Sequence, residues 1–130
     1  MRLALEAGFR HIDTAQGYKN EEEVGLGITD SSVPRSEIFV TTKIATDIMR
    51  EGQEAVRQSI DESLAKLKMD YIDLLLIHWP VKDCVRNTWQ VMEDYVWQGK
   101  VRSIGVSNFN RHHLDDLLAY AGIRPVVNQI

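Results

Sequence analysis

Cysteine is almost absent from this sequence, since Cys84 is the only one among 130 residues. A single cysteine excludes an internal disulfide and a metal site built from several cysteines. It also fits a reducing compartment, where thiols are not oxidised. We therefore expect a cytoplasmic protein.

Long apolar runs and an excess of positive charge are missing as well. No run approaches the roughly 20 apolar residues of a membrane-spanning helix, and the opening MRLALEAGFRHID lacks the apolar stretch and cleavage site of a secretory signal. The formal net charge is −4 at pH 7, and no basic cluster is interleaved with aromatic residues. We expect a soluble protein that binds neither membranes nor nucleic acid.

What the sequence does contain is ordinary for a folded domain. Hydrophobic residues make up 44% and charged residues 26%, which is enough to build a core. No internal repeat, low-complexity segment or linker divides the chain. The sequence therefore predicts a single domain over residues 1–130.

Short apolar stretches alternate with amphipathic ones along the chain. Five stretches have the composition of strands: 9–13, 37–43, 71–78, 101–108 and 125–130. Four stretches between them predict helices, at 20–28, around 56–67, at 87–99 and at 110–122, and a further helix at 2–7 precedes the first strand. Such alternation predicts parallel strands joined by right-handed crossovers.

Local signals predict where the helices begin, end and face the core. Capping boxes are expected at Asn20 with Glu23 and at Asn87 with Gln90, and glycine stops at positions 8 and 99. Glycines 25 and 27 weaken the helix at 20–28, so packing must hold it. The predicted buried stripes are Val56, Ile60, Leu64 and Leu67; Trp89, Met92 and Val96; and Leu114, Leu117, Leu118 and Ala121.

Polar side chains stand where each predicted strand ends. They are Asp13, Lys43, His78, Ser107, Asn108, Asn128 and Gln129. A single histidine beside an apolar run is more often a satisfied core residue, but this repetition favours a functional role. In a parallel barrel the carboxyl ends of the strands form the active-site face.

Two kinds of site fit these residues poorly. A Ser107–His78–Asp13 triad is formally possible, but Ser107 lacks the G-x-S-x-G turn that exposes a nucleophile. A metal site would combine Asp13 and His78 with His11, which lies one pleat deeper and better fits a satisfied polar residue of the barrel core. The pair at 112 and 113 is expected to be exposed near a helix start, so we predict no metal.

Proton delivery to a polarised oxygen fits better. Tyr18, in the loop after Asp13, carries a phenol, and a nearby Lys43 ammonium would stabilise its phenolate. Asp13 would keep the lysine charged, and His78 could orient a carbonyl. Taken alone, Tyr18 would be interpreted as a loop residue that covers the barrel end.

Four segments carry a family resemblance: GFRHIDTAQGYKNEEEVG, DYIDLLLIHWP, GKVRSIGVSNF and PVVNQI. Together they resemble the aldo-keto reductases across essentially the whole chain. The resemblance implies an α/β fold, the parallel (β/α)8 TIM barrel, and reduction of aldehydes or ketones with NADP(H) held without a Rossmann domain. The absence of G-x-G-x-x-G agrees with this.

The resemblance also implies roles for individual residues. The catalytic tetrad of the family corresponds to Asp13, Tyr18, Lys43 and His78, with Tyr18 as general acid. Trp79 corresponds to a residue of the substrate pocket. Ser107, Asn108 and Gln129 correspond to residues that hydrogen-bond the nicotinamide carboxamide.

The length departs from the family pattern, because a complete barrel takes about 250 residues. The resemblance places strands two to six in this chain, without the first, seventh and eighth. In the family, the end of the barrel that is missing here normally supplies the aromatic residue that stacks on nicotinamide and the clamp for the 2′-phosphate. We expect a partial barrel of a reductase acting on a small-molecule carbonyl substrate. The alternative is a truncated, weakly active or inactive relative with a structural or partner-binding role, whose open barrel edges favour self-association.

Overall fold

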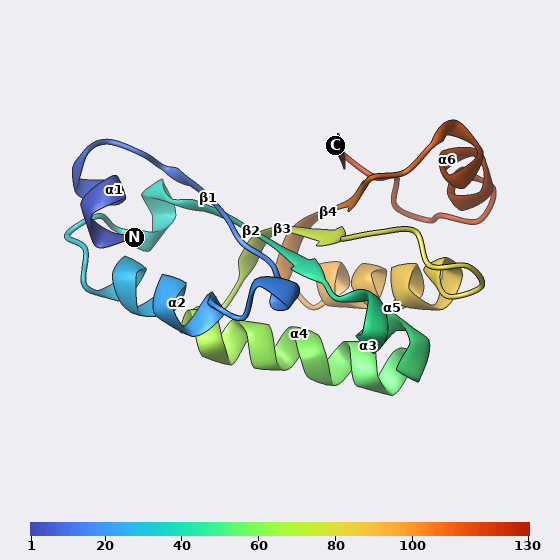
Figure 1. The fold of residues 1–130 in the computed structure, drawn as a ribbon, viewed down its shortest axis with the longest axis horizontal. Helices are drawn as coiled ribbons and strands as arrows, with labels where there is room; N and C mark the ends of the chain where they lie inside the picture. The colour runs from blue at the N-terminus through green and yellow to red at the C-terminus, as the bar shows by residue number, and fades with distance from the viewer.

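The structure, a computed structural model, describes residues 1–130. Its five parallel strands are β1 (His11–Asp13), β2 (Phe39–Ile44), β3 (Ile72–Ile77), β4 (Val101–Ser107) and β5 (Asn128–Gln129). Their order in the sheet is the order in the chain, and the sheet curls as it proceeds (Figure 1). The predicted alternation of parallel strands and helices is confirmed.

The chain also contains six helices and two 3₁₀ turns, and all of them except α1 lie between strands. The helices are α1 (Arg2–Glu6), α2 (Glu21–Thr29), α3 (Thr46–Glu51), α4 (Gln53–Leu67), α5 (Val85–Trp97) and α6 (Arg111–Leu118), and the turns are η1 (Gln16–Tyr18) and η2 (Arg35–Glu37). Helices α2, α4 and α5 lie along one face of the sheet (Figure 1). The short α3 was not predicted. No helix has the combination of length and apolarity that crossing a membrane requires.

The core lies between these helices and the convex face of the sheet. In α4, Val56, Ile60 and Leu67 are buried as predicted and Leu64 is partly buried. In α5 the predicted stripe is present too, since Trp89 and Met92 are fully buried and Val96 partly so.

The stripe predicted for the last helix is only partly right. Leu117 is buried and Leu114 packs against the core, but Leu118 is 43% exposed. Ala121 lies beyond the end of α6, although it still contacts the core. The helix is shorter than the pattern suggested, so the predicted spacing does not extend to its last positions.

Neither of the two predicted capping boxes forms. Helix α5 begins at Val85 after the N-cap Cys84, so Asn87 lies inside the helix. Asn20 does occupy the N-cap of α2, but its side chain makes no capping bond. Instead its Oδ1 accepts a hydrogen bond of 2.6 Å from Thr14 Oγ1. The predicted stops are correct, with a φ of +109° at position 8 and +76° at position 99.

Packing explains why α2 tolerates a glycine in its interior. A Cβ at Gly25 would lie 2.5 Å from Lys66 O and 2.8 Å from Leu67 Cα. These are backbone atoms of α4, which cannot move aside as a flexible side chain could. The two helices can approach this closely only without a side chain at Gly25.

We expect Gly25→Ala to destabilise the chain by about 1–3 kcal/mol, because the overpacking cost exceeds the gain in helix propensity. Gly17→Ala is the matched control, since a Cβ there would meet no atom within 4 Å. Urea unfolding of both variants at equal protein concentration measures the difference. Equal stability of the two variants would show that α2 and α4 are not in such close contact.

The concave face of the sheet has no helix layer over it (Figure 1). Curvature shields its centre, where Thr41 and Leu76 are fully buried. Toward the edges apolar side chains are accessible, with Phe39 and Val127 each 42% exposed. The edge strands β1 and β5 each pair with one neighbour only. Unpaired strand edges and exposed apolar side chains both favour association.

We propose that the 130-residue chain by itself associates through this face, since each apolar side chain it covers contributes up to roughly 1.5–3 kcal/mol. Phe39→Lys should weaken the association. Trp97→Lys should leave it unchanged, because Trp97 ends α5 on the helical side and is already 80% exposed. Light scattering across a concentration series measures the mass, and a compact monomer at all concentrations would contradict the proposal.

Candidate active site

The carboxyl ends of the strands bring the predicted polar residues to one edge. In the parallel register Asp13 is opposite Thr41, and Ser107 is opposite Gln129. His78 directly follows β3, and its N–H donates to Ile44 O at 3.4 Å at the end of β2. The rim predicted from the ends of the apolar runs is therefore present.

Lys43 is the buried centre of this rim, with 2% of its side chain exposed. Its ammonium pairs with the Asp13 carboxylate and donates to Thr14 O at 2.9 Å. A buried ammonium is stable only when such acceptors replace the water it has lost. The Asp13 carboxylate and the Thr14 carbonyl therefore replace the lost water around the ammonium at the end of β2.

Asp13 also connects the two edges of the sheet. Its second carboxylate oxygen accepts a hydrogen bond of 2.6 Å from Gln129 Nε2. Asp13 ends β1 and Gln129 ends β5, which lie at opposite edges of the strand order. This hydrogen bond spans the mouth of the curled sheet and brings the first and last strands to one site.

Tyr18 is the last residue of the 3₁₀ turn η1. The next residue, Lys19, has the left-handed conformation with φ +58°. Its side chain is about half exposed. Lys43 Nζ lies 5.1 Å from the centroid of the phenol ring. The ring also meets His78 edge to face, with 5.7 Å between ring centroids. Tyr18 therefore faces both the buried ammonium and the imidazole.

His78 is held neutral by its surroundings. Burial lowers the pKa of His78 below its ordinary value of 6.5, the Lys43 ammonium lowers it further, and the Asp13 carboxylate opposes the change. Neutral imidazole carries one N–H donor and one acceptor nitrogen. At pH 7 His78 can therefore donate one hydrogen bond to an oxygen without bringing a second positive charge next to Lys43.

The lowered pKa of His78 makes stability depend on pH. Between the unfolded value of 6.5 and the lower folded value, the unfolded chain binds more protons, so stability falls as the pH falls. We expect this loss just below pH 6.5 to be smaller in His78→Gln than in the wild type. Urea unfolding at several pH values measures it, and an NMR titration gives the pKa directly. An imidazole pKa at or above 6.5 would contradict this account.

Ser107 and Asn108 bind the neighbouring strand ends together. The Ser107 hydroxyl donates to Gln129 O at 2.8 Å and accepts from Asn108 Nδ2 at 3.1 Å. Asn108 Nδ2 also donates to His78 O at 3.2 Å, and this residue is left-handed with φ +58°. Asn108 Oδ1 and Gln129 Oε1 have no hydrogen-bond partner within the chain. Two amide oxygens at the rim are therefore available to a ligand.

Asn128 and Trp79 occupy different environments. Asn128 makes a reciprocal pair with the backbone of Phe109, its Nδ2 donating at 2.8 Å and its Oδ1 accepting at 3.1 Å. Both ends of its amide are thus bonded inside the fold. Trp79 is 52% exposed, and its ring lies nearly parallel to His78 with 6.5 Å between centroids. Trp79 therefore presents an apolar surface beside the imidazole.

The geometry does not assemble the hydrolase triad, because no hydrogen bond joins Ser107 to His78. His11 lies apart from the rim. Its Nε2 is 3.1 Å from Thr41 Oγ1, and its ring contacts Phe39 edge to face. The structure places no three His, Cys, Asp or Glu residues together as a metal site. His11 is a partnered polar residue on the concave face, although the open face leaves it exposed.

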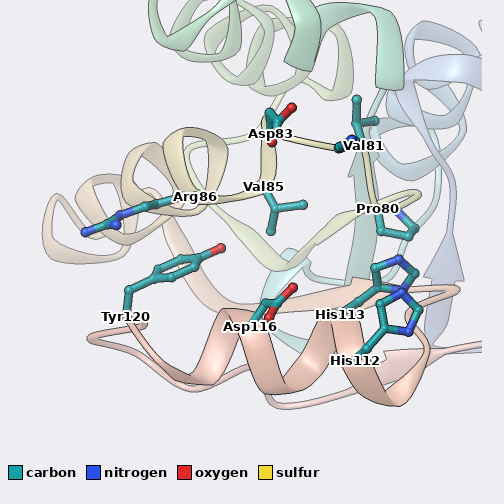
Figure 2. A pocket seen from close by; sticks show the side chains of 10 residues that line it. Pro80, Val81, Asp83, Val85, Arg86, His112, His113, Asp116 and Tyr120 are labelled. Atoms are coloured by element: carbon teal, nitrogen blue, oxygen red, sulfur yellow. The ribbon is translucent and has the colours of Figure 1, made fainter.

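A pocket of about 650 Å³ lies beside the rim, between the loop after Trp79 and helix α6 (Figure 2). Its lining residues are Pro80, Val81, Lys82, Asp83, Val85, Arg86, His112, His113, Asp116 and Tyr120. His112 is exposed as predicted, whereas His113 is half-buried, and its Nδ1 accepts from Asn110 N at 3.0 Å. None of the predicted site residues lines this pocket, because the rim itself opens onto the concave face.

The model of a family described as the Aldo/keto reductase family matches residues 1–130. Glyoxal reductase of Bacillus subtilis is 48% identical over 130 residues, which cover 100% of this chain and 46% of the relative. The chain thus spans about half the length of the curated relatives it matches.

Solved structures agree with this. An aldo-keto reductase from a Medee basin deep-sea metagenome superposes with a TM-score of 0.94 at 51% identity, over 98% of this chain and 46% of that one. An aldo-keto reductase of Bombyx mori in complex with NADP gives a TM-score of 0.88 at 45% identity, over 99% of this chain and 46% of that one. The five-stranded curled sheet is therefore about half of a (β/α)8 barrel, as predicted.

Proposed function

The chain belongs to the aldo/keto reductase family, and we propose that it forms the catalytic half of a reductase that transfers hydride from NADP(H) to a small aldehyde or ketone. The observation that carries the proposal is the buried Lys43 ammonium, paired with Asp13 and facing both Tyr18 and His78. This arrangement provides a proton donor, a group that stabilises its anion and a hydrogen-bond donor around one open position.

Tyr18 acts as the general acid. Its hydroxyl gives its proton to the carbonyl oxygen while the carbonyl carbon accepts hydride, so the product is an alcohol and the residue is left as phenolate. The Lys43 ammonium, 5.1 Å from the ring centroid, stabilises that negative charge. Asp13 keeps the ammonium paired before and after the step. A proton taken up from the solvent then restores the phenol.

His78 orients the carbonyl. A neutral imidazole beside Tyr18 donates one hydrogen bond to the substrate oxygen and leaves proton transfer to the phenol. The half-exposed Trp79 ring covers one side of the same position. An exposed aromatic surface next to a single polar position suits a compact carbonyl compound, and glyoxal, after which the Bacillus subtilis relative is named, is of this size.

The rim fits a nicotinamide carboxamide. Asn108 Oδ1 and Gln129 Oε1 can accept its N–H groups, and the Ser107 hydroxyl lies within the same hydrogen-bonded cluster. When bound, NADPH supplies the hydride. Residues on this chain hold the nicotinamide end only, and the Bombyx relative with bound NADP supports the choice of cofactor.

We expect Tyr18→Phe to lower turnover by about 10² to 10⁴-fold, because only the proton donor is removed. The assay uses a hybrid barrel, in which residues 1–130 replace the matching half of Bacillus subtilis glyoxal reductase, with glyoxal as substrate and NADPH oxidation as the signal. Tyr71→Phe is the control and should leave turnover unchanged. It removes the same hydroxyl group from a tyrosine whose ring contacts the guanidinium groups of Arg35 and Arg102 and none of the rim residues. NADPH binding, followed by tryptophan fluorescence, should be retained. Near-normal reduction by Tyr18→Phe would refute the assignment.

A structural or partner-binding role is the second candidate, favoured by the accessible concave face of the sheet. It predicts that the hybrid barrel folds without reducing glyoxal and that its fluorescence does not respond to NADPH. The reductase proposal requires both turnover and a fluorescence response from the same hybrid.

A further inference from the structure

The turn that carries Tyr18 has little to fix it from within. Its backbone makes two bonds, Tyr18 N to Ala15 O at 3.1 Å and Lys19 N to Gln16 O at 3.3 Å. The phenol is half exposed, and no hydrogen bond within the chain involves its hydroxyl. A general acid needs a defined position, because a displacement of about 1 Å can cost up to 10²-fold in rate. The position must therefore be set by contacts outside the turn.

Gln16, two residues before Tyr18, makes those contacts with its side chain. Its Oε1 accepts from Ala45 N at 2.9 Å, and Ala45 lies two residues after Lys43. Its Nε2 donates to two groups of helix α4, Ser59 O at 3.2 Å and Ser63 Oγ at 3.1 Å. One partly buried amide thus joins the Tyr18 turn to the end of β2 and to α4.

The same amide connects to β2 a second time through a buried carboxylate. Ser63 Oγ donates to Glu21 Oε1 at 3.2 Å, and Glu21 Oε2 accepts from Thr42 Oγ1 at 2.7 Å. Glu21 is only 4% exposed, and Thr42 directly precedes Lys43. Gln16 is therefore linked to residues on both sides of Lys43, directly at Ala45 and through the carboxylate at Thr42.

From this geometry we infer that Gln16 is a positioning residue, which holds the Tyr18 phenol at a fixed place relative to the Lys43 ammonium. The inference rests on the proposed function, since it assigns Gln16 a part in the same proton transfer. Gln16 does not touch the reacting atoms. Its amide is suited to the task because it offers a donor and an acceptor at once.

Gln16→Met tests the inference, since it keeps the length of the side chain and removes its hydrogen bonds. The matched control is Gln53→Met, because Gln53 Nε2 also donates two bonds, to Asn87 O at 3.1 Å and Gln90 Oε1 at 3.2 Å, on the exposed surface between α4 and α5. In the hybrid barrel we expect kcat to fall by about tenfold or more in Gln16→Met, with the KM for NADPH unchanged and the control unaffected.

A second measurement, on the 130-residue chain, does not depend on activity. Amide hydrogen exchange at Ala45 and Lys19 should accelerate by about tenfold or more in Gln16→Met, while amides in the middle of β3 keep their protection. The control Gln53→Met should change neither amide. Exchange separates the two claims, because an inactive wild-type hybrid refutes the proposed function while exchange still decides whether Gln16 holds the turn.

Either of two results would overturn the inference: a kcat within twofold of the wild type, or unchanged exchange at both amides. Gln16→Ala is the second variant, and it avoids placing an apolar chain among the polar groups of α4. If both variants unfold, Gln16 serves the fold as a whole and the inference is likewise overturned.

Discussion

An ammonium that is 2% exposed must find acceptors inside the protein, and this requirement at Lys43 organises the rim. Lys43 pairs with Asp13 at the end of β1 and with the carbonyl of Thr14, where the next loop begins. That loop carries Tyr18 back over the ammonium. The loop after β1 thus brings the phenol ring to 5.1 Å from the buried charge. Burial and the same ammonium keep His78 neutral beside it.

Curvature of the sheet brings these groups within reach of one another. Strands β1 and β5 are the two edges, yet Gln129 donates to the Asp13 carboxylate that neutralises Lys43. Because the site draws on every strand end from β1 to β5, no single segment of the chain could provide it. The convex face, packed against α2, α4 and α5, holds the hydrophobic core, and the polar rim lies at the carboxyl ends of the strands (Figure 1).

The strands and most rim residues could be predicted from sequence, because a run such as 72–77 is apolar apart from Asp73 and then stops at His78. Helix-capping patterns, which depend on one side chain bonding to a nearby backbone group, were less reliable. Asn20 matched a capping pattern, but Thr14 competes for its side chain. Gln16 gave no local signal at all, since its partners lie 29, 43 and 47 positions further along the chain. Such contacts exist only once the fold has brought distant elements together.

The account depends most on the coupling between Asp13 and Lys43, and a double-mutant cycle measures it directly. Asp13→Asn, Lys43→Met and the double variant are unfolded in urea, and the free energies of unfolding are compared with that of the wild type. The account predicts a coupling above about 1 kcal/mol, because each single change leaves a charge or polar group without its partner. Additive effects within about 0.5 kcal/mol would contradict it, since the two residues would then contribute independently.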